Sequence, residues 1–211
     1  MRVRDCGVAL VDSAALVMQG ISVALVCSLP SGATEGNERW ADESVRIVAY
    51  DARWPERFEQ ERLALEAAIG EWAVGGIHHV GSTAVPGLDA KPVIDILAGV
   101  ESLPAGRACF DPLAQLDYLY APYRTEEMHW FCKPHPSRRT HHLHLVPVGS
   151  GLYAEELAFR DHLRSNHRAA SEYAALKHEL AARFADDREA YTEAKADFIR
   201  TALERATGDP V

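Results

Sequence analysis

In the segment 77–98, IHHVGSTAVPGLDAKPVIDILA, a glycine–serine pair precedes an aspartate that lies alone inside an apolar run, with twelve residues between Ser82 and Asp95. A glycine that follows a strand lets the backbone approach a phosphate closely, and the Ser82 hydroxyl with neighbouring N–H groups can hold the phosphate oxygens. We therefore take Gly81, Ser82 and Thr83 as candidate phosphate-binding residues. Without the aspartate, the Gly-Ser pair would be typical of a tight turn.

Asp95 lies in the middle of the apolar run VIDILAGV, residues 93–100, which is typical of a strand. A carboxylate in such a run is costly to bury unless it is paired, hydrogen-bonded or bound to a metal. Two interpretations stay open. Asp95 is either a metal ligand and catalytic residue, or a structural carboxylate bonded to a turn or to Arg139.

A second strand-like run, HHLHLVPV at 141–148, carries candidate partners for Asp95. Alternation along a strand puts His142 and His144 on one face, and neutral imidazole is a good ligand for Zn, Mn, Fe or Ni. Together with Asp95 they predict a divalent metal ion (Mg, Mn or Zn), although a half-exposed strand with a histidine-rich polar face fits the same pattern. His79 is a candidate fourth ligand or catalytic base, with a packing role as the alternative.

Basic residues beside these segments could complete an anion site. Lys91 precedes the Asp95 strand and Arg139 begins the histidine segment. Arginine binds phosphate or carboxylate with two parallel hydrogen bonds, whereas the alternative is an exposed basic loop. Farther along the chain, Lys177 and the i, i+4 pair Tyr191 and Lys195 could face the same cleft. We interpret these three as structural.

The elements that position these residues are a helix and strands, followed by a helical tail. The helix WPERFEQERLALEAAIGEW (54–72) has Phe58, Arg62, Leu65 and Ile69 on one face. Strands are expected at 77–82, 93–100, 127–134 and 141–148, a short strand or an extended lead-in at 45–51, and a helix at 105–119. From Leu152 onward we expect three helices, the second capped by Ser171 and the third spanning 186–205. This order indicates an α+β fold with a mixed or antiparallel sheet.

The composition limits the partners. A net charge of −9 argues against a protein that coats DNA or an anionic membrane surface. It does not exclude a nucleotide or phosphorylated small molecule held by a metal and a few local basic residues. The four cysteines, Cys6, Cys27, Cys109 and Cys132, form no C-x-x-C pair. They indicate reduced thiols in a cytoplasmic protein.

Residues 1–44 differ from the rest of the chain. They begin with two arginines, turn apolar, and end in a polar segment. Asp5 and Asp12 interrupt the apolar run, which makes it a poor transmembrane helix. A weak signal peptide, a small extra element and an over-extended gene start all fit. We interpret 1–44 as a poorly packed extension and 45–211 as the folded domain.

Five stretches together resemble the GrpB family: YDARWPERFEQE (50–61), HHVGSTAVPGLDAKPVIDI (78–96), RTHHLHLV (139–146), LAFRDHLRSN (157–166) and DREAYTEAKADFI (187–199). The resemblance implies a nucleotidyltransferase-like α+β fold, with a mixed sheet flanked by helices and a C-terminal helical segment. Members of the family are described as nucleotidyltransferases, and a related domain is fused to dephospho-coenzyme A kinase in some bacteria.

The sequence departs from the nucleotidyltransferase pattern at Leu97, where that superfamily has a second acid in a D-x-D or D-x-E strand. Two metal ions about 3.5–4 Å apart need shared carboxylate oxygens, which one aspartate does not readily supply. Three function classes follow. The first is metal-dependent transfer or hydrolysis on a nucleotide or phosphorylated small molecule, with Asp95 and His79 as catalytic residues. The second is a non-catalytic module that binds a nucleotide or coenzyme A precursor or assists folding. The third is a metal site for stability or sensing.

Overall fold

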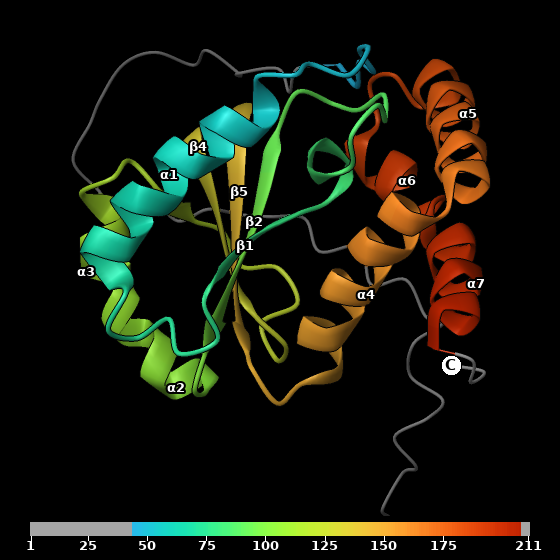
Figure 1. Ribbon diagram of the computed structural model, residues 1–211. Coiled ribbons are helices and arrows are strands. Elements are labelled where there is room, and N and C mark those ends of the chain that lie inside the picture. The colour runs from blue at the N-terminus through green and yellow to red at the C-terminus, as the bar shows by residue number, and fades with distance from the viewer. Residues whose placement is uncertain (1–43, 208–211) are drawn as a thin grey trace, which may run out of the picture. The chain divides into compact units, whose positions relative to one another are not determined.

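The computed structural model describes residues 44–207, which contain a five-stranded sheet between two groups of helices (Figure 1). The strands are β1 (Ile77–Val80), β2 (Ile94–Val100), β3 (Leu119–Tyr120), β4 (His129–His135) and β5 (Arg138–Pro147). Their order in the sheet is β1-β2-β5-β4-β3. In this sheet β2 and β5 pair in parallel, and the other three pairs of neighbouring strands are antiparallel. The predicted α+β fold with a mixed sheet is confirmed.

The helices divide between the two faces of the sheet (Figure 1). One face carries α1 (Trp54–Ile69), α2 (Leu103–Gly106), the 3₁₀ helix η2 (Arg107–Cys109) and α3 (Phe110–Ala114). On the other side lie α4 (Gly151–Ser165), α5 (His167–Arg183), α6 (Arg188–Glu193) and α7 (Ala196–Thr207). A second 3₁₀ helix, η1 (Ser82–Ala84), follows β1. The expectations for residues 1–43, including Cys6 and Cys27, lie outside the described residues, whereas Cys109 and Cys132 are both buried.

Alternation along β2 gives the sheet two different faces. Ile94 and Ile96 pack with Leu65 of α1 in the main hydrophobic core. Leu97 points the other way and joins a second apolar cluster with Trp130 of β4 and Leu157 of α4. Because a fully buried leucine or isoleucine contributes about 1.5–3 kcal/mol, this pattern holds β2 in register, and it holds Asp95 on the same face as Leu97.

Side-chain caps set the starts of the C-terminal helices. Ser150, Asn166 and Asp187 each accept a hydrogen bond from the backbone N–H three residues ahead, at the starts of α4, α5 and α6. The expected cap at Ser171 is wrong. Its hydroxyl donates to the carbonyl of His167 within α5, because Asn166 has already begun that helix.

The expected third helix, 186–205, is also wrong as one piece. It is divided into α6 and α7, and Lys195 lies in the break between them. The expected helix at 105–119 consists of the short elements α2, η2 and α3, where Pro112 has no N–H to continue the helical hydrogen bonds.

The structure also bears on two smaller expectations, the form of the stretch 45–51 and the buried face of α1. The stretch 45–51 makes a single bridge, Val48 with Ala90. On α1 the buried polar residue is Glu61, whereas Arg62 pairs with Glu59 and Glu66 on the outer side.

Candidate functional site

Gly81 joins β1 to η1 and touches Asp95. Its φ of 68° lies in the region that glycine favours, and a Cβ placed there would lie 2.3 Å from Asp95 Oδ2. Any larger residue would therefore displace the Asp95 carboxylate. The predicted pairing of the Gly-Ser turn with Asp95 is a direct packing contact in this structure.

Asp95 is held by His142. The two residues are register partners on the parallel strands β2 and β5, and His142 Nδ1 donates to Asp95 Oδ1 at 2.8 Å. Burial opposes the charge on Asp95, but the hydrogen bond and the neighbouring charges of His142, His144 and Lys91 outweigh it and hold the pKa of Asp95 at about 2. Burial lowers the pKa of His142. An ionised aspartate that accepts a hydrogen bond from His142 results.

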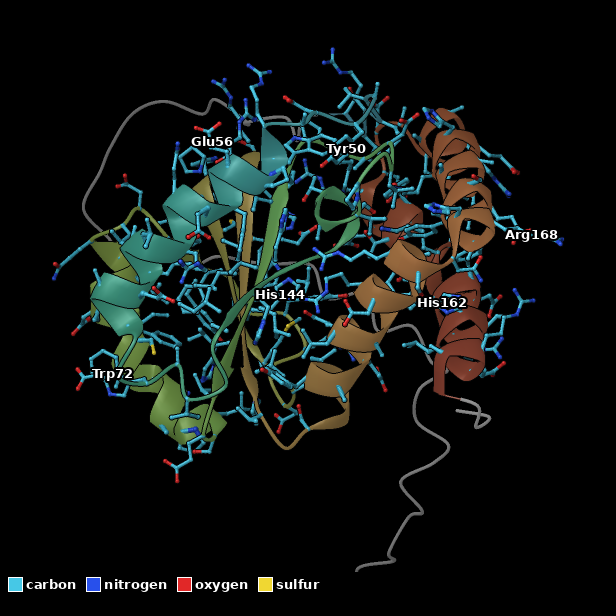
Figure 2. All side chains as sticks on the ribbon, viewed as in Figure 1. Tyr50, Glu56, Trp72, His144, His162 and Arg168 are labelled. Atoms are coloured by element: carbon cyan, nitrogen blue, oxygen red, sulfur yellow. The ribbon has the colours of Figure 1, made fainter. Side chains whose placement is uncertain are left out.

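His144 is held by a second carboxylate, which lies on α4. Its Nδ1 is 2.8 Å from Glu156 Oε1, and its ring lies between the sheet and α4 (Figure 2). Burial disfavours the charged imidazole, yet Glu156 more than compensates and raises the pKa of His144. Nothing in the sequence singles out Glu156 among the acidic residues of this helix, so sequence reasoning missed it.

These pairings bear on the predicted metal ion. His142 and His144 each use Nδ1 for a carboxylate, and the two carboxylates come from different elements. Among residues 44–207, no three His, Cys, Asp or Glu side chains form a group that could hold a metal ion. The predicted set of Asp95, His142 and His144 therefore does not fit a divalent ion in this arrangement, and the ion stays a prediction.

His79 and Thr83 lie beneath the Gly-Ser turn. The His79 ring stacks on Phe58 with centroids 4.6 Å apart, and its Nε2 lies 3.0 Å from Thr83 Oγ1. Thr83 in turn donates to the carbonyl of Val93 at 3.0 Å. Burial lowers the pKa of His79 to about 4. This geometry favours the packing role for His79 and a positioning role for Thr83.

Leu97 explains why the site has one acid on β2. It faces the same side of the sheet as Asp95 and has no solvent exposure. Val80, Trp130 and Val146 surround it with apolar groups. The position of the second acid is thus part of a hydrophobic cluster beneath α4.

Lysines gather near Asp95. The Nζ atoms of Lys91 and Lys195 lie 5.0 and 4.5 Å from the centroid of the Tyr191 ring. Burial lowers the pKa of each lysine to about 8, and the charge of Asp95 acts in the opposite direction on both. Lys91 comes from the loop before β2 and Lys195 from the break between α6 and α7, so chain segments about 100 residues apart build this pair.

A third lysine, Lys177 of α5, lies deeper. It is 2% exposed, its Nζ donates to the carbonyl of Asp89, and it lies 4.7 Å from the Tyr173 ring centroid. Burial lowers its pKa to about 7. Ser82 acts on the pKa of Tyr173 in the direction opposite to burial, which places the Gly-Ser turn near this lysine's surroundings.

The scarcity of lysine is the sequence signal that could have found this site. The chain has only four lysines against eighteen arginines. Three of the four surround Asp95, and the fourth, Lys133, donates to both carboxylate oxygens of Glu61 at 2.6 and 2.7 Å. We call Lys91, Lys177 and Lys195 the lysine cluster. Lys177, Tyr191 and Lys195, for which the sequence suggested a structural role, lie near Asp95 in the structure, and that role stays a prediction.

Arg139 borders the lysine cluster. Its guanidinium lies 5.1 Å from the Trp130 ring centroid and its Nε donates to the carbonyl of Pro136 at 2.6 Å. Its charge contributes to the lowered pKa of Lys91. Asp95 accepts a hydrogen bond from His142, and the alternative in which Asp95 pairs with Arg139 stays a prediction.

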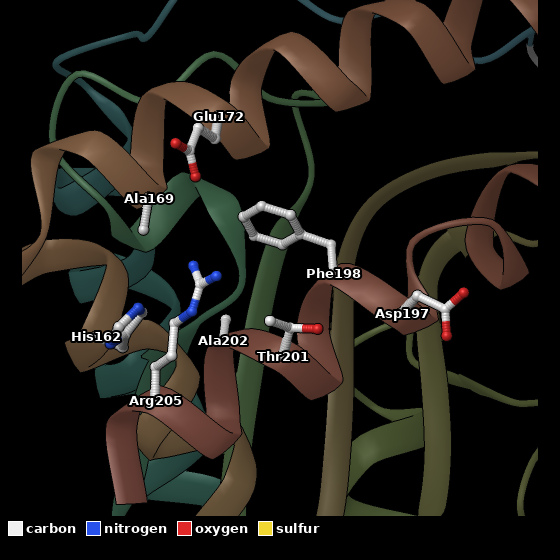
Figure 3. A pocket seen from close by; sticks show the side chains of 8 residues that line it. All are labelled: His162, Ala169, Glu172, Asp197, Phe198, Thr201, Ala202 and Arg205. Atoms are coloured by element: carbon white, nitrogen blue, oxygen red, sulfur yellow. The ribbon is translucent and has the colours of Figure 1, made fainter. Parts of the chain in front are cut away.

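A hollow of about 270 Å³ lies away from these residues, among α4, α5 and α7 (Figure 3). It is lined by His162, Ala169, Glu172, Asp197, Phe198, Thr201, Ala202 and Arg205. None of the predicted site residues lines it, so we place the candidate site at the lysine cluster on chemical grounds.

Comparisons with known proteins agree on one family. The family described as GrpB protein matches residues 44–205. A UPF0157 protein of Pseudomonas aeruginosa is 39% identical over 177 residues, covering 80% of this chain and 72% of that protein. The crystal structure of GrpB from Enterococcus faecalis has a TM-score of 0.70 and 32% identity, covering 77% of this chain and 98% of that one. The chain belongs to the GrpB family.

A dephospho-CoA kinase of Mycolicibacterium paratuberculosis is also similar, with 30% identity over 187 residues. The match covers 77% of this chain and 46% of the kinase. In the described part of the chain, no helix combines the length and the apolar character needed to cross a membrane.

Proposed function

We propose that this GrpB protein binds a phosphate ester, either a nucleotide or another phosphorylated small molecule, at the lysine cluster beside Asp95. The observation that carries the proposal is the gathering of three of the chain's four lysines around one carboxylate. Within residues 44–207, no carboxylate oxygen lies within 4.0 Å of any of their Nζ atoms.

The charges of the site support an anionic ligand. Buried ammonium groups are costly without a counter-ion, and burial lowers the pKa of all three lysines. Asp95, the acid whose charge acts on all three lysines, already accepts a hydrogen bond from His142. A phosphate would supply the missing negative charge, with Ser82 beside it on the Gly-Ser turn.

Nucleotidyl or phosphoryl transfer is the catalytic form of this proposal. The nucleotidyltransferase-like resemblance favours it, whereas Leu97 and the pairing of His142 with Asp95 favour a binding module without turnover. Because a dephospho-CoA kinase contains a similar region, coenzyme A precursors belong among the ligands to test.

Thermal unfolding with added ligands tests the proposal. Pyrophosphate, ATP and dephospho-coenzyme A are added to the full chain, with and without Mg²⁺ or Mn²⁺. A ligand at 100 times its Kd stabilises the protein by about 2.7 kcal/mol, which is roughly a 5–10 °C rise in Tm for a chain of this size.

Two variants and a control locate the binding. Lys91→Gln and Lys195→Gln should each abolish most of the Tm rise. Arg168→Gln removes a positive charge from a side chain that is 89% exposed on α5 (Figure 2) and should leave the rise intact. If no phosphate compound raises Tm, or if the lysine variants respond like wild type, the proposal is wrong.

A further inference from the structure

The use of lysine at this site calls for an explanation beyond positive charge. Elsewhere the chain uses arginine for nearly every basic position, and arginine binds phosphate at least as well. Lysine differs because its amine can lose a proton and act as a nucleophile, which the guanidinium group does not do in proteins. A site that contains three of the chain's four lysines is therefore a candidate for amine chemistry.

Lys91 is the best placed of the four lysines for a reaction. Its side chain is partly exposed, as is that of Lys195, while Lys177 is buried. Lys133 is held by both oxygens of Glu61. Lys91 and Lys195 share the Tyr191 ring, with both Nζ atoms within 5.0 Å of its centroid. An accessible amine thus lies beside a second cation.

The surroundings favour a free amine on Lys91. Burial contributes most to its lowered pKa of about 8, followed by the charge of Lys195. Asp95 opposes the shift, and Arg188 and Arg139 add to it. Near pH 7.5 roughly a quarter of Lys91 would be unprotonated, against about one part in a thousand for an ordinary lysine. Burial and a neighbouring cation are the two devices that activate lysine nucleophiles in enzymes.

We propose that Lys91 forms an imine with the carbonyl group of a phosphorylated aldehyde or ketone, whose phosphate is held by Lys195. The proposal rests on the phosphate site inferred above. The neutral amine attacks the carbonyl carbon and forms a C–N bond. The resulting carbinolamine loses the former carbonyl oxygen as water, together with the two hydrogens of the amine, and leaves a C=N bond. No oxidant or reductant is needed.

Borohydride trapping of pyridoxal 5′-phosphate, an aldehyde that carries a phosphate, tests this assignment. The full chain is incubated with the probe, reduced, digested and mapped by mass spectrometry, which separates the four lysines from the N-terminal amine. We expect Lys91 to be labelled about tenfold or more faster than Lys133 and Lys177. Pyridoxal, which lacks the phosphate, should label Lys91 more slowly, and pyrophosphate should protect it.

Two variants separate the amine from the charge. Lys91→Arg keeps the cation, so it should lose the label at this position while pyrophosphate still raises Tm. Lys195→Ala removes the neighbouring cation, and the pH profile of Lys91 labelling by pyridoxal should move to higher pH. Lys195→Arg should restore the wild-type profile.

Two results would overturn the inference. One is equal labelling of all four lysines, and the other is a Lys91 rate that is the same with and without the phosphate on the probe. If pyrophosphate raises Tm but Lys91 is not labelled, the imine proposal fails and the phosphate site stands. If Lys91 is labelled selectively but no phosphate compound binds or protects, the phosphate site fails, and with it the role of Lys195.

Discussion

Replacement of Gly81 by alanine is the sharpest test of how the Gly-Ser turn positions Asp95. The new methyl group would have to fit where Asp95 Oδ2 lies 2.3 Å away and the Asp95 Cβ and Cγ atoms lie 2.9 Å away. The methyl group can be accommodated only if β2 shifts or the Asp95 carboxylate rotates. Rotation would break the hydrogen bond from His142.

Two contributions set how far Gly81→Ala lowers the free energy of unfolding. The backbone of Gly81, with φ 68° and ψ −170°, lies in a region that is nearly restricted to glycine, and holding alanine there costs about 1–3 kcal/mol. Loss of the charge-assisted hydrogen bond between His142 and Asp95 adds about 1.5–3 kcal/mol. Gly81→Ala should therefore lower the free energy of unfolding by roughly 3–5 kcal/mol.

Gly87 offers a matched control in the same segment. Its φ is 78°, but a Cβ placed there would meet nothing within 4 Å. Gly87→Ala should lower the free energy of unfolding by only about 1–2 kcal/mol. Urea denaturation followed by circular dichroism measures both variants, and pyrophosphate binding measures the site. If Gly81→Ala and Gly87→Ala lower the free energy of unfolding equally, and both variants still bind pyrophosphate, the idea that Gly81 holds the Asp95 carboxylate in place is refuted.

Three further perturbations test the surroundings of the site. The folded-state pKa of Lys177 is lowered to about 7, so between pH 7 and about 10.5 the unfolded chain binds more protons and stability rises with pH. Lys177→Met should flatten this rise of the free energy of unfolding with pH, measured by urea denaturation across the range. If the free energy of unfolding of the variant still rises with pH as in wild type, burial does not lower the pKa of Lys177 as inferred. Glu156→Gln removes the group that raises the pKa of His144, and NMR titration should show this pKa falling. Leu97→Asp places an acid in an apolar cluster, so it should lower the free energy of unfolding by about 3 kcal/mol or more. A Leu97→Asp variant that gains tight Mg²⁺ binding without losing stability would overturn the interpretation of Leu97 as a core residue.

Much of the fold follows from local patterns. The apolar run at 93–100 and the alternation of His142 and His144 predict strands with the correct facing, because periodicity is set by which residues can be buried. The failures have local causes as well. Pro112 interrupts a helix, Asn166 caps earlier than Ser171, and the break at Lys195 divides a helix whose apolar periodicity looks continuous.

The sequence identifies some residues of the candidate site and misses others. Gly81, Ser82, Asp95 and His142 were found because they lie in two short segments with recognisable spacing. Lys91 was a candidate as well, because it lies directly before the Asp95 strand. Glu156, Lys177 and Lys195 were not singled out, because their contacts come from the packing of α4, α5 and the break between α6 and α7 against the sheet. Such contacts depend on tertiary geometry and leave no spacing in the chain.

The parallel pairing of β2 and β5 has a consequence for how the protein folds. Asp95 and His142 are 47 residues apart in sequence, and the chain between the strands that carry them contains β3 and β4. Contacts of such long range cost loop-closure entropy before they contribute stability, so they form slowly. We therefore expect the Asp95–His142 pair to form late in folding, and the appearance of ligand binding during refolding would report the pairing of β2 with β5.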